Sequence, residues 1–77
     1  MVKVYSFEGC PFCDKTKRYL QARGVEYEVR DVELNLEYAE ELEKISGGDM
    51  VPVTTIDGKN FVLGFDKKKI DELLATA

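Results

Sequence analysis

The chain has 77 residues and a net charge of −4, with two cysteines, no histidine and no tryptophan, and this length predicts one small domain over residues 1–77. The absence of histidine excludes Ser-His-Asp and Cys-His catalysis and any His-ligated metal site, and the negative charge argues against nucleic acid as a partner. No apolar run approaches the roughly 18–20 residues that a membrane helix needs, and no charged-then-apolar leader precedes the first predicted strand, so we expect a cytoplasmic protein.

The N-terminal part of the chain predicts a strand followed by a helix. Residues 2–7 are rich in β-branched and aromatic side chains, which favour a strand. Pro11 suits the first turn of a helix, where its missing N–H costs nothing, and Gly24 is expected to cap the helix end. The positions that recur at helical spacing between them are Phe12, Thr16, Tyr19 and Leu20.

The middle of the chain predicts a second strand and a second helix. Residues 25–32 alternate apolar and charged side chains, as a half-exposed strand does. The helix that follows is expected to end at Gly47-Gly48. Its apolar face consists of Leu34, Tyr38, Leu42 and Ile45, and its acidic face, which we interpret as a solvated surface, of Glu33, Glu37, Glu40, Glu41 and Glu43.

The C-terminal part predicts a hairpin and a closing helix. Residues 51–56 and 60–63 predict two strands, and Asp57-Gly58 between them is a strong hairpin signal. Asp66 is expected to cap the start of the last helix. The apolar face of that helix consists of Ile70, Leu73, Leu74 and Ala77.

The predicted elements follow one another in the order β-α-β-α-β-β-α. A helix between the first two strands implies a right-handed parallel crossover, and the hairpin signal implies an antiparallel pair. The sequence therefore predicts an α/β fold with one mixed four-stranded sheet flanked by three helices.

Cys10 and Cys13 bracket Pro11-Phe12 at the junction between the first strand and the first helix. Cys10 falls at the cap of the helix, beside unpaired backbone N–H groups and the positive end of the helix dipole, so we expect a lowered pKa for its thiol. Cys13 lies about one turn further on, and we expect it to be less exposed and less activated. The pair predicts one attacking thiolate and one resolving thiol.

Such a pair is suited to disulfide exchange. Cys10 would attack a substrate disulfide to form a mixed disulfide, and Cys13 would then attack that bond, release the reduced substrate and leave a Cys10–Cys13 disulfide. A reductant would restore the dithiol. No histidine is needed, because the helix terminus and backbone supply the electrostatics, and we expect no bound cofactor and no metal.

Three other interpretations of the cysteines remain open. A structural disulfide would close a loop of four residues, which stabilises by roughly 2 kcal/mol at best, and it would tend to be reduced in the cytosol. A thiolate metal or iron–sulfur binding module would lack two of the four ligands of a zinc site unless two chains pair. Two inert buried thiols are the third interpretation, and the cap position argues against it.

Two further segments are candidates for substrate contact. Val51-Pro52 precedes the third strand, where a proline at the strand start is tolerated. Gly64-Phe65-Asp66 opens the last helix, whose N-terminal N–H groups could bind a carboxylate while Asp66 accepts a hydrogen bond from an amine. The capping role and the binding role of Asp66 are compatible.

Together these residues resemble the glutaredoxins, within the thioredoxin superfamily, over essentially the whole chain. The resemblance rests on Tyr5-Ser6 with Cys10-Pro11-Phe12-Cys13, on Val51-Pro52 about 40 residues later, and on Gly64-Phe65-Asp66. It implies a minimal thioredoxin-like fold and a small monomeric dithiol–disulfide oxidoreductase that reduces protein or glutathione mixed disulfides. It also implies Cys10 as nucleophile, Cys13 as resolver and a cis Val51–Pro52 bond.

The same resemblance implies ligands and partners. Glutathione is the expected co-substrate, and disulfide-containing proteins are the expected substrates. The Cys-Pro-Phe-Cys site looks less like that of the iron–sulfur-carrying branch, which typically has a monothiol Cys-Gly-Phe-Ser site. The groove for glutathione or substrate would be formed by Pro11, Phe12, Val51, Pro52, Gly64, Phe65 and Asp66.

Three positions depart from the family pattern. Phe7 stands where glutathione-using members often carry lysine, Phe12 where tyrosine is usual, and Leu63-Gly64 where two glycines are usual. The missing lysine weakens the case for glutathione as sole reductant. The Gly64-Phe65 turn is also similar to that of small redoxins reduced by thioredoxin reductase, so a donor of that type is the alternative.

Overall fold

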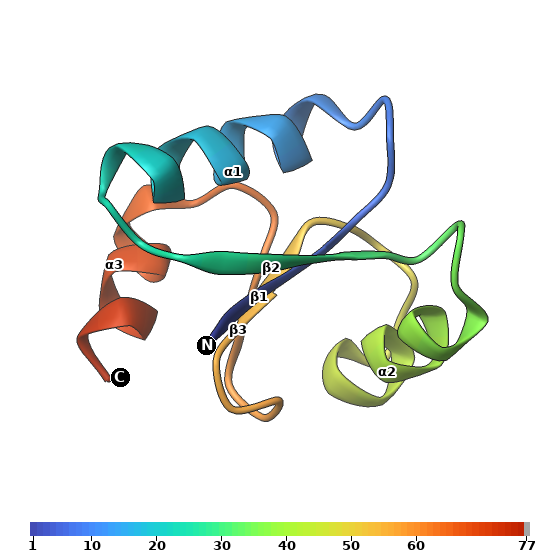
Figure 1. The fold of residues 1–77 in the computed structure, drawn as a ribbon. Coiled ribbons are helices and arrows are strands. Elements are labelled where there is room, and N and C mark those ends of the chain that lie inside the picture. Colours follow the sequence, from blue (N-terminus) through green and yellow to red (C-terminus); the bar gives the residue numbers. More distant parts are fainter. Residues whose placement is uncertain (77) are drawn as a thin grey trace.

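The computed structural model describes residues 1–76, and its elements follow the predicted order β-α-β-α-β-β-α (Figure 1). Ala77, which the pattern placed on the apolar face of the last helix, lies outside the described residues. The bounds of the elements are β1 Val2–Ser6, α1 Pro11–Ala22, β2 Tyr27–Asp31, α2 Leu36–Ser46, β3 Val53–Thr55, β4 Phe61–Leu63 and α3 Lys67–Ala75.

The four strands form one mixed sheet in the order β2-β1-β3-β4. β1 runs parallel to β2, beginning with Val2 opposite Tyr27, and α1 makes the crossover between these two strands. β1 runs antiparallel to β3, and β3 and β4 form the antiparallel pair that Asp57-Gly58 predicts. The mixed sheet and both pairing directions are therefore confirmed.

Helices α1 and α3 pack on one face of the sheet, against the side chains of Val2 and Val4. Leu20 from α1 and Ile70 from α3 are completely buried there. Burying a leucine or isoleucine side chain is worth about 1.5–3 kcal/mol, so these contacts hold both helices against the sheet and with them the start of α1. In Figure 1 α3 lies below one end of α1, and α2 lies on the other side of the sheet strands.

Helix α2 packs on the opposite face, which is the side to which Tyr5 and Val53 point. Leu42 is buried in this second cluster, and Tyr38 and Ile45 pack around it. This confirms the predicted apolar face of the second helix at three of its positions. Because successive side chains of a strand point to opposite faces, β1 contributes to both clusters.

Two predicted apolar positions prove to be outside the core. Leu34 is 85% exposed and lies before α2, which begins at Leu36 with Asn35 as its N-cap. Phe12 is 58% exposed, and the buried face of α1 is formed instead by Cys13, Thr16 and Leu20. In both cases the apolar side chain sits within two residues of a helix start, where the spacing rule does not yet define which face is buried.

The strands are shorter than the sequence predicts. This is because the apolar pattern extends over more residues than those that pair with a neighbouring strand. The first strand ends at Ser6, and the second covers only Tyr27–Asp31 of residues 25–32. The predicted strand 51–56 is reduced to Val53–Thr55, which matches the three positions at which β3 pairs with β1.

The predicted end of the second helix is confirmed, whereas the cap of the first helix differs by one residue. α1 ends at Ala22 with Arg23 as its C-cap, and Gly24 follows with φ +69°. α2 ends at Ser46, and its C-cap Gly47 adopts a left-handed conformation with φ +77° and donates its N–H to the Glu43 carbonyl. Glycine takes this conformation without the steric cost that a Cβ atom adds.

Candidate active site

Cys10 is the N-cap of α1, as the sequence predicts. Its backbone is extended, with φ −96° and ψ 106°, and its carbonyl accepts the first helical hydrogen bond from the Asp14 N–H at 3.1 Å. Pro11 occupies the first helical position, where it has no N–H to leave unpaired. The short loop between β1 and α1 includes Gly9 at φ +84°, which lets the chain turn from the sheet into the helix.

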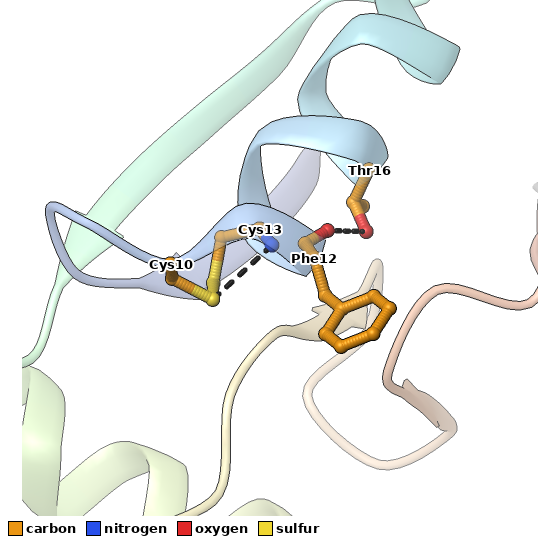
Figure 2. The surroundings of a disulfide bond; sticks show 4 residues. All are labelled: Cys10, Phe12, Cys13 and Thr16. Atoms are coloured by element: carbon orange, nitrogen blue, oxygen red, sulfur yellow. Dashed lines mark hydrogen bonds between the residues drawn. A yellow bond between two sulfur atoms is a disulfide. The ribbon is translucent and has the colours of Figure 1, made fainter.

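Cys10 and Cys13 form a disulfide, with their Cα atoms 5.2 Å apart (Figure 2). The backbone N–H of Cys13 donates to the Cys10 sulfur at 3.2 Å. Cys13 is completely buried, whereas 7% of Cys10 remains exposed. The predicted asymmetry in exposure is thus present: the sulfur that receives the helix N–H bond belongs to the residue with access to solvent.

Phe12 lies between the cysteines in sequence, but its ring points away from the sulfur atoms (Figure 2). Its carbonyl accepts a hydrogen bond from the Thr16 hydroxyl at 2.9 Å, and Thr16 is completely buried. The Nζ atom of Lys15 lies 5.3 Å from the centre of the Phe12 ring. Phe12 therefore offers an exposed aromatic ring that is directed away from the disulfide and has a cation over it.

The Val51–Pro52 peptide bond is cis, as the family resemblance implies. Pro52 is buried and Val51 is half-buried. The Gly64 N–H donates to the Pro52 carbonyl at 2.8 Å. This bond brings together two of the predicted site segments, which are separated by a hairpin in the sequence, and the φ of +78° at Gly64 allows the turn that follows β4.

Phe65 and Asp66 lead into α3. Phe65 is half-buried, and its ring packs edge-to-face against Tyr19 of α1, with the ring centres 6.0 Å apart. Asp66 is the N-cap of α3, and its carboxylate accepts a hydrogen bond from the Lys69 N–H at 3.1 Å. The capping role is confirmed, and the contact between Phe65 and Tyr19 ties the turn to the active-site helix.

Two residues near the site have structural roles that the sequence did not suggest. The sequence indicates Thr16 only as a position at helical spacing, although its hydroxyl donates a hydrogen bond to the Phe12 carbonyl. Tyr19 is the residue of α1 against which the Phe65 ring packs. The spacing of four residues between Phe12 and Thr16 is the local signal for the first contact, whereas no local signal predicts the second.

A polar network lies on the other face of the sheet. Tyr5 donates a hydrogen bond to the Glu41 carboxylate at 2.8 Å, and Arg30 forms ion pairs with Glu41 and Glu28. Burial and the hydrogen bond to Glu41 raise the pKa of Tyr5. The hydrogen bond from Tyr5, assisted by Arg30, lowers the pKa of Glu41. This network joins α2 to the sheet at Tyr5, one of the residues that carry the family resemblance.

Among residues 1–76, no group of three or more histidine, cysteine, aspartate or glutamate side chains is placed to hold a metal ion. None of the helices in this part of the chain has the length and apolar character that crossing a bilayer requires.

Comparison with known proteins identifies one family. A protein-family model described as Glutaredoxin matches residues 2–62, a range that contains both cysteines and the cis proline. A curated glutaredoxin-like 8.6 kDa protein from Clostridium pasteurianum is 39% identical over 74 residues. That alignment covers 96% of this chain and 97% of the relative, so it extends past the family match.

Solved structures with the same fold include a glutaredoxin from Archaeoglobus fulgidus and the NrdH-redoxin from Escherichia coli. The first has a TM-score of 0.82 and 33% identity, and the match covers 95% of this chain and 84% of the other. The second has a TM-score of 0.80 and 32% identity, with 94% and 92% covered, and is described as a glutaredoxin-like protein with a thioredoxin-like activity profile. The fold is therefore thioredoxin-like.

Proposed function

Because the chain belongs to the glutaredoxin family and is a thiol–disulfide oxidoreductase with a redox-active Cys-x-x-Cys, we propose that Cys10 is its nucleophile and Cys13 its resolving thiol. The observation that carries this assignment is the position of Cys10 at the N-cap, where its sulfur accepts the Cys13 N–H. A thiolate at this atom gains from the N–H and from the helix dipole. Because Cys13 is completely buried, we assign it the second step, the attack on the mixed disulfide at Cys10.

The reaction transfers two electrons from the protein dithiol to a substrate disulfide. The Cys10 thiolate bonds to one substrate sulfur, and the other substrate sulfur leaves as a thiolate. Cys13, after loss of its proton, bonds to the Cys10 sulfur and releases the second substrate thiolate, which leaves the Cys10–Cys13 disulfide of the present structure. A donor of two further electrons returns the protein to the dithiol.

The substrate groove is proposed to run from Phe12 to the turn before α3. Pro11 and Phe12 would form one wall, and Phe12 supplies an exposed ring. The backbone of Val51, next to Pro52, would pair with an extended substrate segment. Support for the far wall comes from the bond between Gly64 and Pro52, since it holds Gly64-Phe65-Asp66 against that segment.

Protein disulfides and glutathione mixed disulfides are the proposed substrates, with glutathione as co-substrate. The N–H groups at the start of α3 would bind a glutathione carboxylate, and Asp66 would accept a hydrogen bond from its amine. Phe7, half-buried, supplies no charge where many family members have lysine. We therefore propose detectable but not exclusive use of glutathione.

A thioredoxin-reductase-type donor is the second candidate. The similarity to the NrdH-redoxin, for which a thioredoxin-like activity profile is described, favours it. The Gly64-Phe65 turn, with its resemblance to the turn of small redoxins that use this donor, favours it as well. We further propose that the protein works as a monomer in the cytoplasm, where thiols are kept reduced.

Parallel turnover with the two donors tests this proposal. We expect wild-type protein to reduce a disulfide substrate with either glutathione and glutathione reductase or with NADPH and thioredoxin reductase. Cys10→Ser should lose activity with both donors, by about a thousandfold or more, because no other thiolate can attack first. Cys13→Ser should accumulate a mixed disulfide at Cys10.

Three outcomes of these experiments would each contradict a different part of the proposed function. Full activity of Cys10→Ser would contradict the assignment of the nucleophile. Absence of turnover with glutathione at any concentration would contradict the groove as proposed here. Stoichiometric metal on anaerobically purified protein, together with no disulfide exchange, would favour a thiolate metal or iron–sulfur binding module instead.

A further inference from the structure

A hollow lined by cations lies between α1 and the start of α3, next to the proposed groove. Its volume is about 340 Å³, and it is lined by Lys15, Arg18, Tyr19, Phe65 and Lys67. Three of these five side chains are positively charged and none is acidic. This composition is unusual for a protein whose net charge is −4.

The aromatic side of this cationic hollow is held in place by several contacts. Tyr19 and Phe65 pack edge-to-face, and the Nζ atom of Lys67 lies 5.9 Å from the centre of the Tyr19 ring. The Tyr19 hydroxyl donates to Asp71, which also forms an ion pair with Arg23. Asp71, the carboxylate bonded to Tyr19, is therefore already paired with Arg23, which lies outside the hollow.

The three cations of the hollow have no such partner. Within residues 1–76, Lys15, Arg18 and Lys67 form no ion pair, and all three are exposed. The carboxylates nearest to them in sequence are Asp14 in the first turn of α1 and Asp66, which is engaged in capping α3. The positive charge of the hollow is therefore available to a ligand.

Two residues of the cationic hollow connect it to the segments of the proposed groove. Lys15 lies over the ring of Phe12, the residue between the two cysteines. Phe65 follows Gly64, whose N–H is bonded to the Pro52 carbonyl. A substrate segment that reached Cys10 along this edge would therefore pass Lys15 on one side and Phe65 on the other.

We propose that the cationic hollow receives the acidic side chains of a protein substrate, from a segment rich in aspartate and glutamate that flanks the disulfide to be reduced. The proposal rests on the function proposed above and adds a substrate class to it. A volume of about 340 Å³ accommodates a few side chains, and aromatic walls suit their aliphatic stems. Glu37, Glu40 and Glu43 lie on α2, which packs on the opposite face of the sheet, so the acidic surface does not oppose this approach.

Surface charges of this kind affect the rate of encounter with the substrate and its binding more than they affect the rate of thiol–disulfide exchange. Each exposed ion pair contributes only modestly to binding, so the three cations together would give about a tenfold preference for an acidic segment. The preference would decline with salt, because the Debye length falls from about 8 Å at physiological ionic strength to about 3 Å at 1 M.

Two disulfide-bonded peptides that differ only in their flanking residues, glutamate in one and lysine in the other, test this proposal. We expect kcat/KM to be about tenfold higher for the glutamate peptide at low salt. The variant Lys15→Gln/Arg18→Gln/Lys67→Gln should reduce that ratio to about one, through KM. Redox-inert peptides with serine in place of cysteine should show the same preference in binding, which gives a readout independent of turnover.

The matched control is Lys44→Gln/Lys59→Gln/Lys69→Gln, which lowers the net charge by the same amount at positions outside the hollow. This control should keep the preference. Equal binding of the two inert peptides, or equal loss of preference in both triple variants, would overturn the proposal. A triple hollow variant that lost affinity for glutathione but kept the peptide preference would assign the hollow to glutathione and also overturn it.

Turnover of hydroxyethyl disulfide, a small neutral substrate, tests the thiol chemistry separately. If wild-type protein failed to reduce it with either donor, the proposed function would be wrong, whatever the peptides bind. If it reduced this substrate but showed no preference between the peptides, only the acidic substrate class would be wrong.

Discussion

Cys10 serves as both a helix cap and a redox group. Serine, threonine, aspartate and asparagine are the side chains that best cap a helix through their oxygen atoms, and a sulfur atom is a weaker acceptor. Cys10 accepts the Cys13 N–H nonetheless, so the group that helps to start α1 is also the proposed nucleophile. Serine at position 10 would still provide a cap, and loss of activity in Cys10→Ser would therefore report on the thiol.

The ionisation of Glu41 is coupled to the fold. The hydrogen bond from Tyr5 and the ion pair with Arg30 lower the pKa of its carboxyl. A lowered pKa in the folded state means that the carboxylate stabilises the protein above its unfolded pKa of about 4.3, and that this contribution disappears as pH falls through the folded pKa. Glu41 is partly exposed, so the effect is modest.

We expect Glu41→Gln to lower the free energy of unfolding at pH 7 by about 0.5–1 kcal/mol and to flatten its decline below about pH 4.3. Urea unfolding between pH 3 and pH 7 measures both. The control is Glu43→Gln, because Glu43 is an exposed carboxylate of the same helix without an ion pair among the described residues. Identical pH profiles for the two variants would contradict this role of Glu41.

At the scale of elements, the N-cap residue of α3 has one observed role and one proposed role. Asp66 caps the helix through the Lys69 N–H, which is observed, and accepts a hydrogen bond from glutathione, which is proposed. Asparagine keeps a capping oxygen but loses the charge, whereas alanine loses both. These two substitutions therefore separate the structural role from the binding role.

Asp66→Ala should lower the free energy of unfolding by about 1 kcal/mol, and Asp66→Asn by much less. If Asp66 also binds the glutathione amine, Asp66→Asn should raise KM for glutathione severalfold with little change in stability or in kcat. Thermal unfolding and donor kinetics on both variants measure these effects. Unchanged KM in Asp66→Asn would leave Asp66 with its capping role alone.

The ends of the elements show where sequence patterns are informative. Gly47, Asp66 and Pro11 act through their own backbone or their nearest neighbours, and all three lie where the sequence predicts. Leu34 is predicted on the apolar face of the second helix but lies before α2 and is exposed, and Phe12, at helical spacing with the buried Thr16 and Leu20, is exposed as well. Which apolar side chain is buried depends on what packs against it, and periodicity does not contain that information at a helix end.

At the scale of the whole molecule, one sheet supports two apolar clusters. Leu20 lies in the cluster under α1 and α3, and Leu42 in the cluster under α2. β1 contributes alternate side chains to both, with Val4 on one face and Tyr5 on the other. The loss of either cluster should therefore destabilise the shared sheet and with it the entire fold.

We expect Leu20→Ala and Leu42→Ala each to cost about 2–5 kcal/mol through lost burial and a residual cavity. Such a loss is a large part of the roughly 5–15 kcal/mol that stabilises a typical domain. Each variant should unfold in one transition at lower urea concentration, seen alike by circular dichroism and by tyrosine fluorescence. Two separate transitions would show that the clusters fold independently.

The long-range contacts mark the limit of what the sequence predicts. The active-site pair, its cap position and the order of the elements follow from local patterns. The bond from Gly64 to Pro52, the packing of Phe65 on Tyr19 and the cationic hollow depend on how β4 returns to the sheet. Such contacts join residues that are far apart in the chain, so no local pattern indicates them.

We propose that a helix terminus activates Cys10 in a chain without histidine. The most direct test is the rate of alkylation of Cys10 by iodoacetamide as a function of pH, measured on Cys13→Ser so that one thiol reacts. We predict a midpoint between about 3.5 and 7.5, the range for thiols at helix N-termini and comparable sites. A midpoint at about 8.5, the value of an ordinary cysteine, would contradict the claim.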